Sequence, residues 1–527
     1  MNNFLRRINR KMSLRSAAVL IAASLGVGFV LGFIRTKLIY ANFNDFSTGA
    51  YFVAFEIPDL IFYIFSAGAL SVAFIPVLSD KVFTANMKQA WQLTSAVLNS
   101  LSLVMLAVSL CLVLFPRPIV EIIAPGFSPE RLDVTAQIMR LAAINPLVFS
   151  ITSVFSSIQQ VFGRFFYFAV APLFYNLSII ASIYLFKDSM GVVGLGVGVA
   201  IGALSNVLIL GLGMNRLSFK HSWLLGWKDR AFLQVIKALP ARSLDQGIVY
   251  INSIVQTRIA SELPIQAVSN LKGALYLYNA PISLLGMALG TAAFPRFTRY
   301  LAQNRPDRFK EEFLTVLKAV IWLAIPVVIF SFVSREYWAR IIFSRENSEI
   351  AMIFGWLCLG IFFRTMYAII SRFYYAQKDT LTPLLVTVLV LISNIALSLL
   401  LAAQYGTEGL GMATSLVAVL EILVLASVMH RRDRSLFHAR FFKDLLVIGL
   451  VGLVVAVAAL VAGGWLPLEG EDSYLRFGAK LGLIFGLTFT VHFTVSRLLK
   501  IKESQQFWGY VRRLVRWDRW PLVGGRV

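Results

Sequence analysis

The amino-acid sequence predicts an all-α membrane protein that crosses the bilayer about fourteen times. Of its 527 residues, 58% are hydrophobic and only 14% are charged, whereas soluble domains carry roughly 25% charged residues. Uncharged runs such as 101–115 and 381–404 approach or exceed the ~20 apolar residues that a helix needs to cross a bilayer. These runs lack the alternation of a membrane β-barrel. Because backbone groups in lipid must be satisfied within their own segment, we expect helices.

The apolar runs predict the helices in order. The first six cover 15–41, 47–79, 91–115, 131–161, 166–186 and 191–214. The next six cover 231–259, 265–295, 311–333, 350–375, 381–403 and 408–429, and a last pair covers 441–464 and 474–498. Segments with charged residues, Pro or Gly separate these runs and mark the helix ends. The second, fourth, seventh and eighth runs are long, so we expect tilt or an extension beyond the bilayer.

Basic residues gather in alternate loops. The N-terminal segment carries Arg6, Arg7, Arg10, Lys11 and Arg15. Later basic loops lie at 216–230, 296–310 and 431–443, whereas Glu262, Glu408 and Glu469 lie in the intervening loops. This pattern predicts that both termini are cytoplasmic. It also accounts for the net charge of +22 without nucleic acid as a partner. The basic, tryptophan-rich segment near the C-terminus predicts an amphipathic tail on the anionic cytoplasmic leaflet.

Short motifs recur in the two halves of the chain. Gly191-Val-Val-Gly194-Leu-Gly196 matches Gly406-Thr-Glu-Gly409-Leu-Gly411 at an offset of 215. Phe74-Ile-Pro76 matches Ala293-Phe-Pro295, and Ile122-Ile123 matches Ile341-Ile342, both at an offset of 219. Three motifs at nearly the same offset predict that the first twelve helices form two repeats of six.

The repeats predict the domain organisation. We expect an N-terminal lobe over 1–214, a C-terminal lobe over 215–430, two further helices over 431–498 and the tail over 499–527. Each lobe has an even number of helices, so the two six-helix lobes are expected to be parallel. Such repeats place the substrate between the lobes and work by rocking one lobe against the other.

Ionisable residues lie inside several predicted spans, where each costs roughly 2.5–3.5 kcal/mol on insertion scales. The cations are Arg35, Arg140, Arg242, Lys272 and Arg364, and the anions are Glu56, Asp59, Asp245 and Glu421. A cavity with more cations than anions would suit an anionic ligand such as a diphosphate, which arginine binds in a fork. We expect the five cations to bind substrate, with Arg35 and Arg364 first. Glu56, Asp59 and Asp245 are expected to be structural or coupling charges.

A purely structural role stays open for each of these residues. Arg242 and Asp245 are three residues apart on one predicted helix and can neutralise each other. Arg35 can pair with Glu56 or Asp59 and simply hold two helices together. Arg364 has no carboxylate one turn away, so its partner must come from another helix, from water or from a ligand.

Patterns typical of catalysis or metal binding do not occur in the sequence. The four histidines are scattered, and Cys111 and Cys358 both lie in apolar runs, which predicts neither a metal site nor a disulfide. No P-loop and no nucleophile elbow is present. The sequence therefore predicts a protein that is not an enzyme and that needs no cofactor.

Several segments resemble one known family. They are Leu31-Gly-Phe-Ile-Arg35, Tyr51-Phe-Val-Ala-Phe-Glu-Ile-Pro58-Asp-Leu, Ile64-Phe-Ser-Ala-Gly68, Ala124-Pro-Gly-Phe127, Leu285-Gly-Met-Ala-Leu-Gly-Thr291 and Phe373-Tyr-Tyr-Ala-Gln-Lys-Asp-Thr-Leu-Thr-Pro383. Together they resemble the MurJ/MviN family of lipid II flippases, in the multidrug/oligosaccharidyl-lipid/polysaccharide exporter superfamily. The resemblance implies fourteen helices, the last two forming a groove for a lipid tail. It also implies movement of an undecaprenyl-diphosphate-linked peptidoglycan precursor to the outer leaflet of the cytoplasmic membrane.

The sequence departs from this family at charged positions. Only one of the two family arginines in the first helix remains, Arg35, and the other falls on Phe29. Further charged positions of the family fall on Phe62, Ala67, Leu275, Tyr276 and Asn279. Either Arg140, Arg242, Lys272 and Arg364 replace the missing charge from other helices, or the substrate differs.

We therefore predict a lipid II flippase that works by alternating access. Its expected partners are a lipid-linked anionic substrate, membrane lipids and cell-wall synthesis enzymes. Three alternatives stay open: a flippase for another lipid-linked oligosaccharide, a cation-coupled drug exporter of the same superfamily, and a non-transporting membrane scaffold for wall synthesis. Several cations around one cavity would favour a flippase, and an apolar, closed interface would favour a scaffold.

Overall fold

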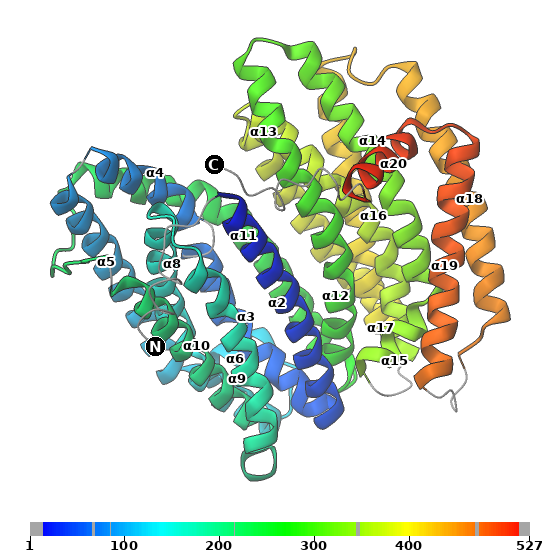
Figure 1. Cartoon of the computed structure of the whole chain (residues 1–527). Helices are drawn as coiled ribbons and strands as arrows, with labels where there is room; N and C mark the ends of the chain where they lie inside the picture. Colours follow the sequence, from blue (N-terminus) through cyan, green and yellow to red (C-terminus); the bar gives the residue numbers. More distant parts are fainter. Residues whose placement is uncertain are drawn as a thin grey trace. The chain divides into compact units, whose positions relative to one another are not determined.

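The computed structural model describes residues 14–65, 69–84, 86–215, 217–343, 348–468 and 474–515. Nearly all of these residues are helical, and none of them forms a strand (Figure 1). Eleven helical stretches in the described ranges are long and apolar enough to cross a membrane. This confirms the predicted all-α, multi-pass membrane fold.

Every predicted span corresponds to helix in the described ranges. The first half contains α2 (Leu14–Asn42), α3 (Asp45–Phe65), α4 (Ala69–Phe83), α5 (Met87–Leu114), α6 (Pro116–Ile123), α7 (Pro129–Ala142), α8 (Asn145–Val161), α9 (Phe166–Met190) and α10 (Val193–Met214). The next part contains α11 (Arg230–Ser261), α12 (Ala267–Ile282), the π-helical turn η1 (Ser283–Met287), α13 (Ala288–Ala302), α14 (Pro306–Val333), α15 (Arg335–Phe343), α16 (Ser348–Ala376) and α17 (Leu381–Arg432). The last part contains α18 (Ala439–Trp465), α19 (Tyr474–Leu498) and α20 (Lys502–Val515).

The eighth predicted span is not one continuous α-helix, because η1 separates α12 from α13. Pro281, just before η1, has no backbone N–H to donate to the preceding turn. Gly286 within η1 packs tightly on α16, where an added Cβ would lie 3.0 Å from Ala368 Cβ. A π-turn is a common way to accommodate such a local break in a helix.

Many large apolar side chains on the long helices are exposed. Leu185 is 70% exposed, Leu208 68% and Leu453 63%. A soluble protein would hide most of such a surface. In this chain the exposed side chains belong to stretches that can cross a membrane, so they form the surface that faces lipid.

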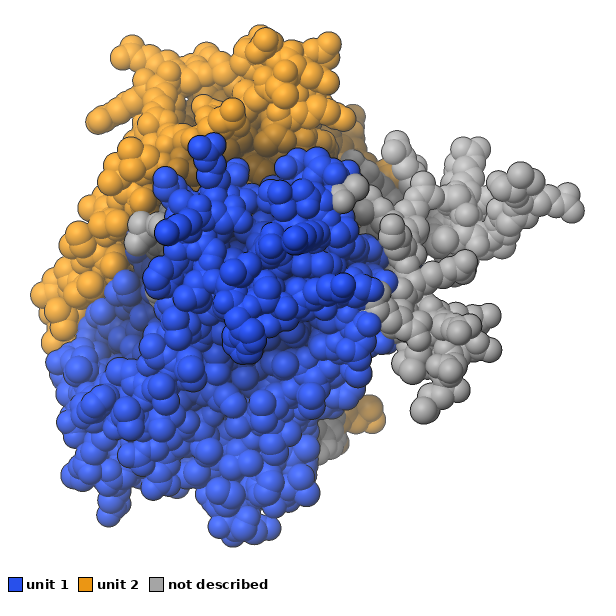
Figure 2. All heavy atoms as spheres, turned by 90° about the vertical axis from the view of Figure 1, so that its left-hand side faces the viewer, with its two compact units in different colours: residues 1–272, 342–344 blue, residues 273–341, 345–527 orange. Residues whose placement is uncertain are grey.

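The contacts divide the chain into two compact units, which Figure 2 distinguishes by colour. Unit 1 comprises residues 1–272 and 342–344, and unit 2 comprises residues 273–341 and 345–527. The boundary between them falls inside α12, directly after Lys272. The lobe boundaries predicted from the repeats, after 214 and after 430, stay predictions.

The internal repeat is visible in the positions at which helices begin. The starts of α5 and α14, and those of α6 and α15, differ by the same offset of 219 that two of the sequence motifs show. Farther along, the ends of α8 and α16 and the starts of α9 and α17 differ by 215, the offset of the glycine motifs. The offset changes in the segment where two helices of the first repeat, α7 and α8, correspond to one helix of the second repeat, α16. The change is close to one helical turn of ~3.6 residues, so this part of the first repeat is one turn longer.

The glycine motifs of the two repeats adopt the same local structure. Gly191 has φ 57° and ψ −139°, and Gly406 has φ 57° and ψ −136°. A Cβ on Gly194 would collide with Phe186, and one on Gly409 would collide with Leu401, eight residues earlier in both cases. Each glycine motif therefore lets two helices turn sharply and pack closely.

Hydrogen bonds also recur between the repeats. Gln159 Nε2 donates to the carbonyl oxygen of Leu210 over 2.8 Å, and Tyr374 Oη donates to that of Leu425 over 2.9 Å. The two donors, and likewise the two acceptors, are related by the offset of the glycine motifs. The segments from α5 to α10 and from α14 to α17 thus repeat in structure as well as in sequence.

Alternate loops of each unit share one end. In unit 1, Arg131 donates to the carbonyl oxygens of Asp45 and Ile265, which joins three loops that were predicted to lie on the same side. In unit 2, Lys310 forms an ion pair with Asp433 over 2.5 Å and so joins two basic loops. These contacts agree with the predicted up-and-down order of the helices. The side of the membrane that each end faces stays a prediction.

Candidate substrate-binding site

A cluster of polar and charged side chains lies inside unit 1. It draws on α2, α3, α11 and α12. Glu56 and Asp59 are three residues apart on α3 and therefore lie on one face of that helix. We refer to Arg35, Glu56, Asp59, Ser253, Thr257 and Lys272 as the unit 1 cluster.

Glu56 and Lys272 form a buried ion pair at the centre of the cluster. The side chain of Glu56 is 5% exposed and that of Lys272 is 13% exposed. Thr257 Oγ1 donates to Glu56 Oε1 over 2.8 Å, and Ser253 Oγ donates to the same oxygen over 3.3 Å. Lys272 Nζ also donates to Ser253 Oγ over 3.0 Å. The carboxylate therefore has three donors, as a buried charge requires.

Arg35 has no such partner. Its Nη1 donates to the neutral Asn176 Oδ1 of α9 over 3.0 Å, and its Nε is buried without an acceptor. No ion pair of Arg35 is found within the described ranges. The structure therefore does not realise the structural alternative in which Arg35 forms a salt bridge with Glu56 or Asp59.

Asp59 completes the cluster. It has no hydrogen bond or ion pair with a described residue, yet it lies near enough to Glu56, Arg35 and Lys272 to interact electrostatically with all three. The cluster thus contains two cations and two carboxylates. Its charge is balanced as long as both carboxylates are ionised, so it lacks the cation excess that we expected of the whole set.

Arg364 is paired within unit 2. Its Nη1 lies 2.7 Å from Glu421 Oε2 of α17. The side chain of Glu421 is 1% exposed and that of Arg364 is 28% exposed. The guanidinium also stands over the Tyr367 ring, 5.0 Å from its centroid. The partner of Arg364 was expected on another helix, in water or in a ligand, and the structure shows it on another helix.

Arg140 joins neither of these groups. Arg140 is exposed on α7 and donates only to the carbonyl oxygen of Val113 over 3.4 Å. Arg242 and Asp245 lie on α11, but their side chains are outside the described part of the chain. Substrate binding by these residues and by the unit 1 cluster stays a proposal.

Sequence reasoning missed the polar partners from α11 and α9. Ser253 and Thr257 are four residues apart, so they form one polar face on a membrane helix. That spacing was a usable signal, because hydroxyl groups in a spanning helix commonly bond to a neighbouring helix. Asn176 gave no comparable signal, since it stands alone in an apolar run.

Uncharged side chains, three of them aromatic, occupy the family positions that lack charge in this sequence. Phe62 packs on Phe149 with ring centroids 5.2 Å apart, and its neighbour Tyr63 stacks on Tyr250 at 4.2 Å. Asn279 donates to the carbonyl oxygen of Leu275 on its own helix. Phe29 is 51% exposed, and Ala67 lies outside the described residues. At the positions that are described, the structure shows no replacement charge.

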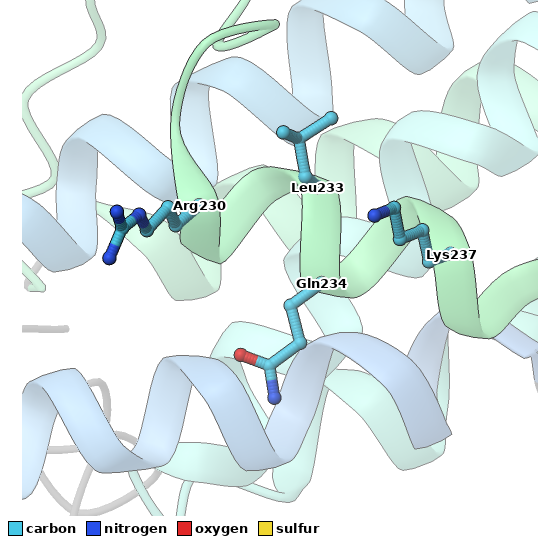
Figure 3. A pocket seen from close by; sticks show the side chains of 4 residues that line it. All are labelled: Arg230, Leu233, Gln234 and Lys237. Atoms are coloured by element: carbon cyan, nitrogen blue, oxygen red, sulfur yellow. The ribbon is translucent and has the colours of Figure 1, made fainter.

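A separate cavity of about 510 Å³ lies at the N-terminal turns of α11 (Figure 3). It is lined by Arg230, Leu233, Gln234 and Lys237. All four come from one helix and are exposed. The cavity shares no residue with the unit 1 cluster.

The described residues contain no group of three or more His, Cys, Asp or Glu side chains that could hold a metal ion. The chemistry available to the unit 1 cluster is therefore ion pairing and hydrogen bonding. Such a cluster can bind or release a charged ligand.

A family model described as lipid II flippase MurJ matches residues 40–469. The probable lipid II flippase MurJ of Thermotoga maritima is 27% identical over 500 residues, which cover 92% of this chain and 97% of the relative. That of Rhizobium tropici is 26% identical over 503 residues, which cover 89% of this chain and 91% of the relative.

Two solved structures share the fold. A lipid II flippase MurJ in an inward closed conformation has a TM-score of 0.76 and 22% identity, and the match covers 91% of this chain and 99% of that one. An inward-facing multidrug resistance transporter of the MATE family, in the MOP superfamily, has a TM-score of 0.65 and 12% identity, with 79% and 99% coverage. Both likenesses support the all-α polytopic fold.

Proposed function

Because the chain belongs to the lipid II flippase MurJ family, we propose that it moves lipid II across the cytoplasmic membrane by alternating access. Lipid II is taken here as the undecaprenyl-diphosphate-linked peptidoglycan precursor. The same proposal places both termini in the cytoplasm and makes cell-wall synthesis enzymes candidate partners.

The observation that carries the proposal is Arg35. This guanidinium lies within a membrane-crossing helix, where its hydrogen bond goes to a neutral amide. A cation that has no ion-pair partner in that position is costly, which points to a function. Arginine donates in a planar fork that matches a phosphate group. A diphosphate headgroup would give Arg35 a charged hydrogen-bond acceptor, which no described residue supplies.

The other candidate cations have subsidiary roles in the proposal. Lys272 and Arg364 each hold a carboxylate already, so they would bind substrate only by sharing or exchanging that partner. Arg140 would contribute from a position outside the unit 1 cluster, and Arg242 would contribute from α11. Glu56, Asp59 and Asp245 would balance charge while no substrate is present.

The membrane potential can drive the proposed movement. An inside-negative potential favours outward transfer of an anionic headgroup by roughly 2.3 kcal/mol per charge per 100 mV, if the charge crosses the whole field. A dedicated proton-binding carboxylate is therefore not required for net transport.

The proposal is tested with purified protein in liposomes that contain lipid II, by measuring how much lipid II reaches the opposite leaflet. We expect Arg35→Ala to abolish transport and Arg35→Lys to restore only part of it, because a point charge cannot reproduce the fork. The matched control is Arg117→Ala, since Arg117 is exposed and pairs with Glu121 and Asp133 away from the cluster. Normal transport by Arg35→Ala at wild-type protein levels would contradict the role of Arg35.

The substrate itself is tested in cells. Depletion of the protein should cause lipid II to accumulate in the inner leaflet. Accumulation of a different lipid-linked oligosaccharide would identify that lipid as the substrate instead. If no lipid-linked precursor accumulates and no transport occurs in liposomes, a scaffold role would replace the flippase proposal.

A further inference from the structure

The Glu56–Lys272 ion pair has features of a displaceable contact. Glu56 is the more deeply buried partner, and Lys272 is the more exposed one. Two hydroxyl groups of α11, those of Thr257 and Ser253, also donate to Glu56. If Lys272 moved to another anion, Glu56 would keep these two donors and would not become an unsatisfied buried charge.

Lys272 also occupies a particular place in the fold. It is the last residue of α12 that belongs to unit 1, and the rest of α12 belongs to unit 2. Within unit 1, the same end of α12 is held by Ser269, which donates to Asp45 Oδ1 over 2.7 Å and accepts a hydrogen bond from Tyr40. Of these contacts between α12 and the rest of unit 1, the Glu56–Lys272 ion pair is the one nearest to the unit boundary.

The charge balance of the unit 1 cluster favours an exchange of this kind. With both carboxylates ionised, Arg35 and Lys272 are matched by Glu56 and Asp59, so an added diphosphate would bring uncompensated negative charge into a low-dielectric environment. Binding becomes more favourable when one cation leaves its internal carboxylate for the ligand. Of the two cations in the cluster, Lys272 is paired with a carboxylate that it can exchange for the ligand, whereas Arg35 is bonded to a neutral amide.

We propose that Glu56 occupies the place of a phosphate group: it pairs with Lys272 until the phosphate of an anionic diphosphate lipid replaces it as the partner of the Lys272 ammonium. This exchange releases the N-terminal end of α12 from α3. The inference rests on the proposed function. It explains what neutralises the site before the substrate binds, and why substrate binding would change the contacts of α12, a helix with residues in both units. A ligand shifts a conformational equilibrium only through such a difference in contacts between two states.

The experiment measures binding of undecaprenyl diphosphate to the purified full-length protein in nanodiscs, with undecaprenol as the uncharged reference lipid. Lys272→Met should weaken binding roughly tenfold or more, the size of one charge-assisted hydrogen bond. Glu56→Gln should tighten binding several-fold, because the internal competitor is lost. In the double variant Glu56→Gln, Lys272→Met the gain should vanish, since no ammonium remains for which the two anions compete.

A charge-reversed pair guards against variants that simply misfold. The double variant Glu56→Lys, Lys272→Glu keeps an ion pair, so we expect it to remain folded and to melt near the wild-type temperature. Its cation now sits at the more buried position 56, and we expect binding as weak as that of Lys272→Met. Full wild-type binding and transport by this variant would show a merely structural pair and overturn the proposal.

Glu312→Gln is the matched control for a general loss of negative charge. Glu312 pairs with Arg296 over 2.8 Å in unit 2, and Arg296 is 48% exposed. This variant should bind undecaprenyl diphosphate as the wild type does. If Glu56→Gln tightens binding no more than Glu312→Gln, the exchange is excluded while the proposed function stands. If the wild-type protein binds undecaprenyl diphosphate no better than undecaprenol, both proposals fail.

Discussion

Arg35 and Arg131 are both arginines of unit 1 that lie among membrane helices, but their surroundings differ. The Arg131 side chain is 4% exposed and donates to the carbonyl oxygens of Asp45, Phe46 and Ile265 over 2.9–3.0 Å. Its guanidinium carbon also lies 3.9 Å from the centroid of the Phe127 ring. Each of the three guanidinium nitrogens of Arg131 therefore has an acceptor, and the side chain holds three loops together, whereas Arg35 keeps a buried nitrogen without an acceptor.

Gly49 provides a test of the Arg131 contacts. A Cβ at Gly49 would lie 1.9 Å from Arg131 Nη2, while the nearest atom of any other residue, on Val268, would be 3.6 Å away. We expect Gly49→Ala and Arg131→Ala each to destabilise the protein, the latter by on the order of 3 kcal/mol from lost charged hydrogen bonds. In the double variant, Gly49→Ala should cost almost nothing further. Melting temperatures of the four proteins give the coupling, and additive effects would contradict the predicted contact.

At the scale of elements, the sharp turns at Gly191 and Gly406 join pairs of helices within a few residues. Both glycines have φ 57° with a strongly negative ψ, a backbone conformation that residues with a Cβ rarely adopt. Neither has another heavy atom within 4 Å of an added Cβ. The requirement for glycine here comes from the backbone conformation rather than from crowding.

We therefore expect Gly406→Ala and Gly191→Ala to destabilise the protein by on the order of 1–3 kcal/mol each. Gly211→Ala is the matched control, because Gly211 lies within α10, has ordinary helical backbone angles and also has no neighbour within 4 Å. Thermal unfolding of the purified variants measures the difference. Equal melting temperatures for Gly406→Ala and Gly211→Ala would show that the turn does not need glycine.

The end of α17 offers a pH-dependent test. The Lys310 ammonium and the Ser435 hydroxyl hold the pKa of Asp433 at about 2, below its ordinary value of about 3.9. A lowered folded-state pKa stabilises the loop fully above about pH 4, and the stabilisation is lost as the pH falls towards 2. Pepsin should therefore cut near residues 433–438 faster, relative to an unfolded reference peptide, as the pH falls from about 4 towards 2. In Asp433→Asn this relative rate of cleavage should be the same at both pH values. If the variant showed the same pH dependence as the wild type, the role of Asp433 would be contradicted.

At the scale of the whole molecule, within-unit contacts support the alternation of the loops. In unit 1, Lys187 after the fifth span donates to Asn42 after the first over 2.9 Å. In unit 2, Tyr337 after the ninth span donates to the carbonyl oxygen of Leu466 after the thirteenth over 2.6 Å. Both contacts join loops that were predicted to face outward. The side of the membrane that these loops face stays a prediction from the positive-inside pattern of the other loops.

Single cysteines test this orientation in a background that carries Cys111→Ser and Cys358→Ser. Cysteines at the exposed positions Asn44, Ser189 and Gln404 should react with an impermeant thiol reagent added to intact cells. Cysteines at the exposed positions Lys88, Asn304 and Arg434 should react only after the membrane is opened. Labelling of one position from each set in intact cells would refute the fourteen-span topology.

The sequence alone determined the helices, the internal repeat and the alternation of basic loops. These features depend on local properties, namely the length of apolar runs, the positions of Gly and Pro, and the charge of short loops. For that reason the offsets between the sequence motifs recur as the offsets between the helix starts.

Only the tertiary structure decided which charges meet. Lys272 pairs with Glu56 across 216 positions, Arg364 pairs with Glu421 across 57, and Arg35 bonds to Asn176 across 141. Composition suggested an excess of cations, whereas packing paired two of them with buried carboxylates and left Arg35 without one. Pairing depends on how helices far apart in the chain pack and rotate against each other. No local pattern encodes that arrangement, because each helix satisfies its backbone hydrogen bonds by itself.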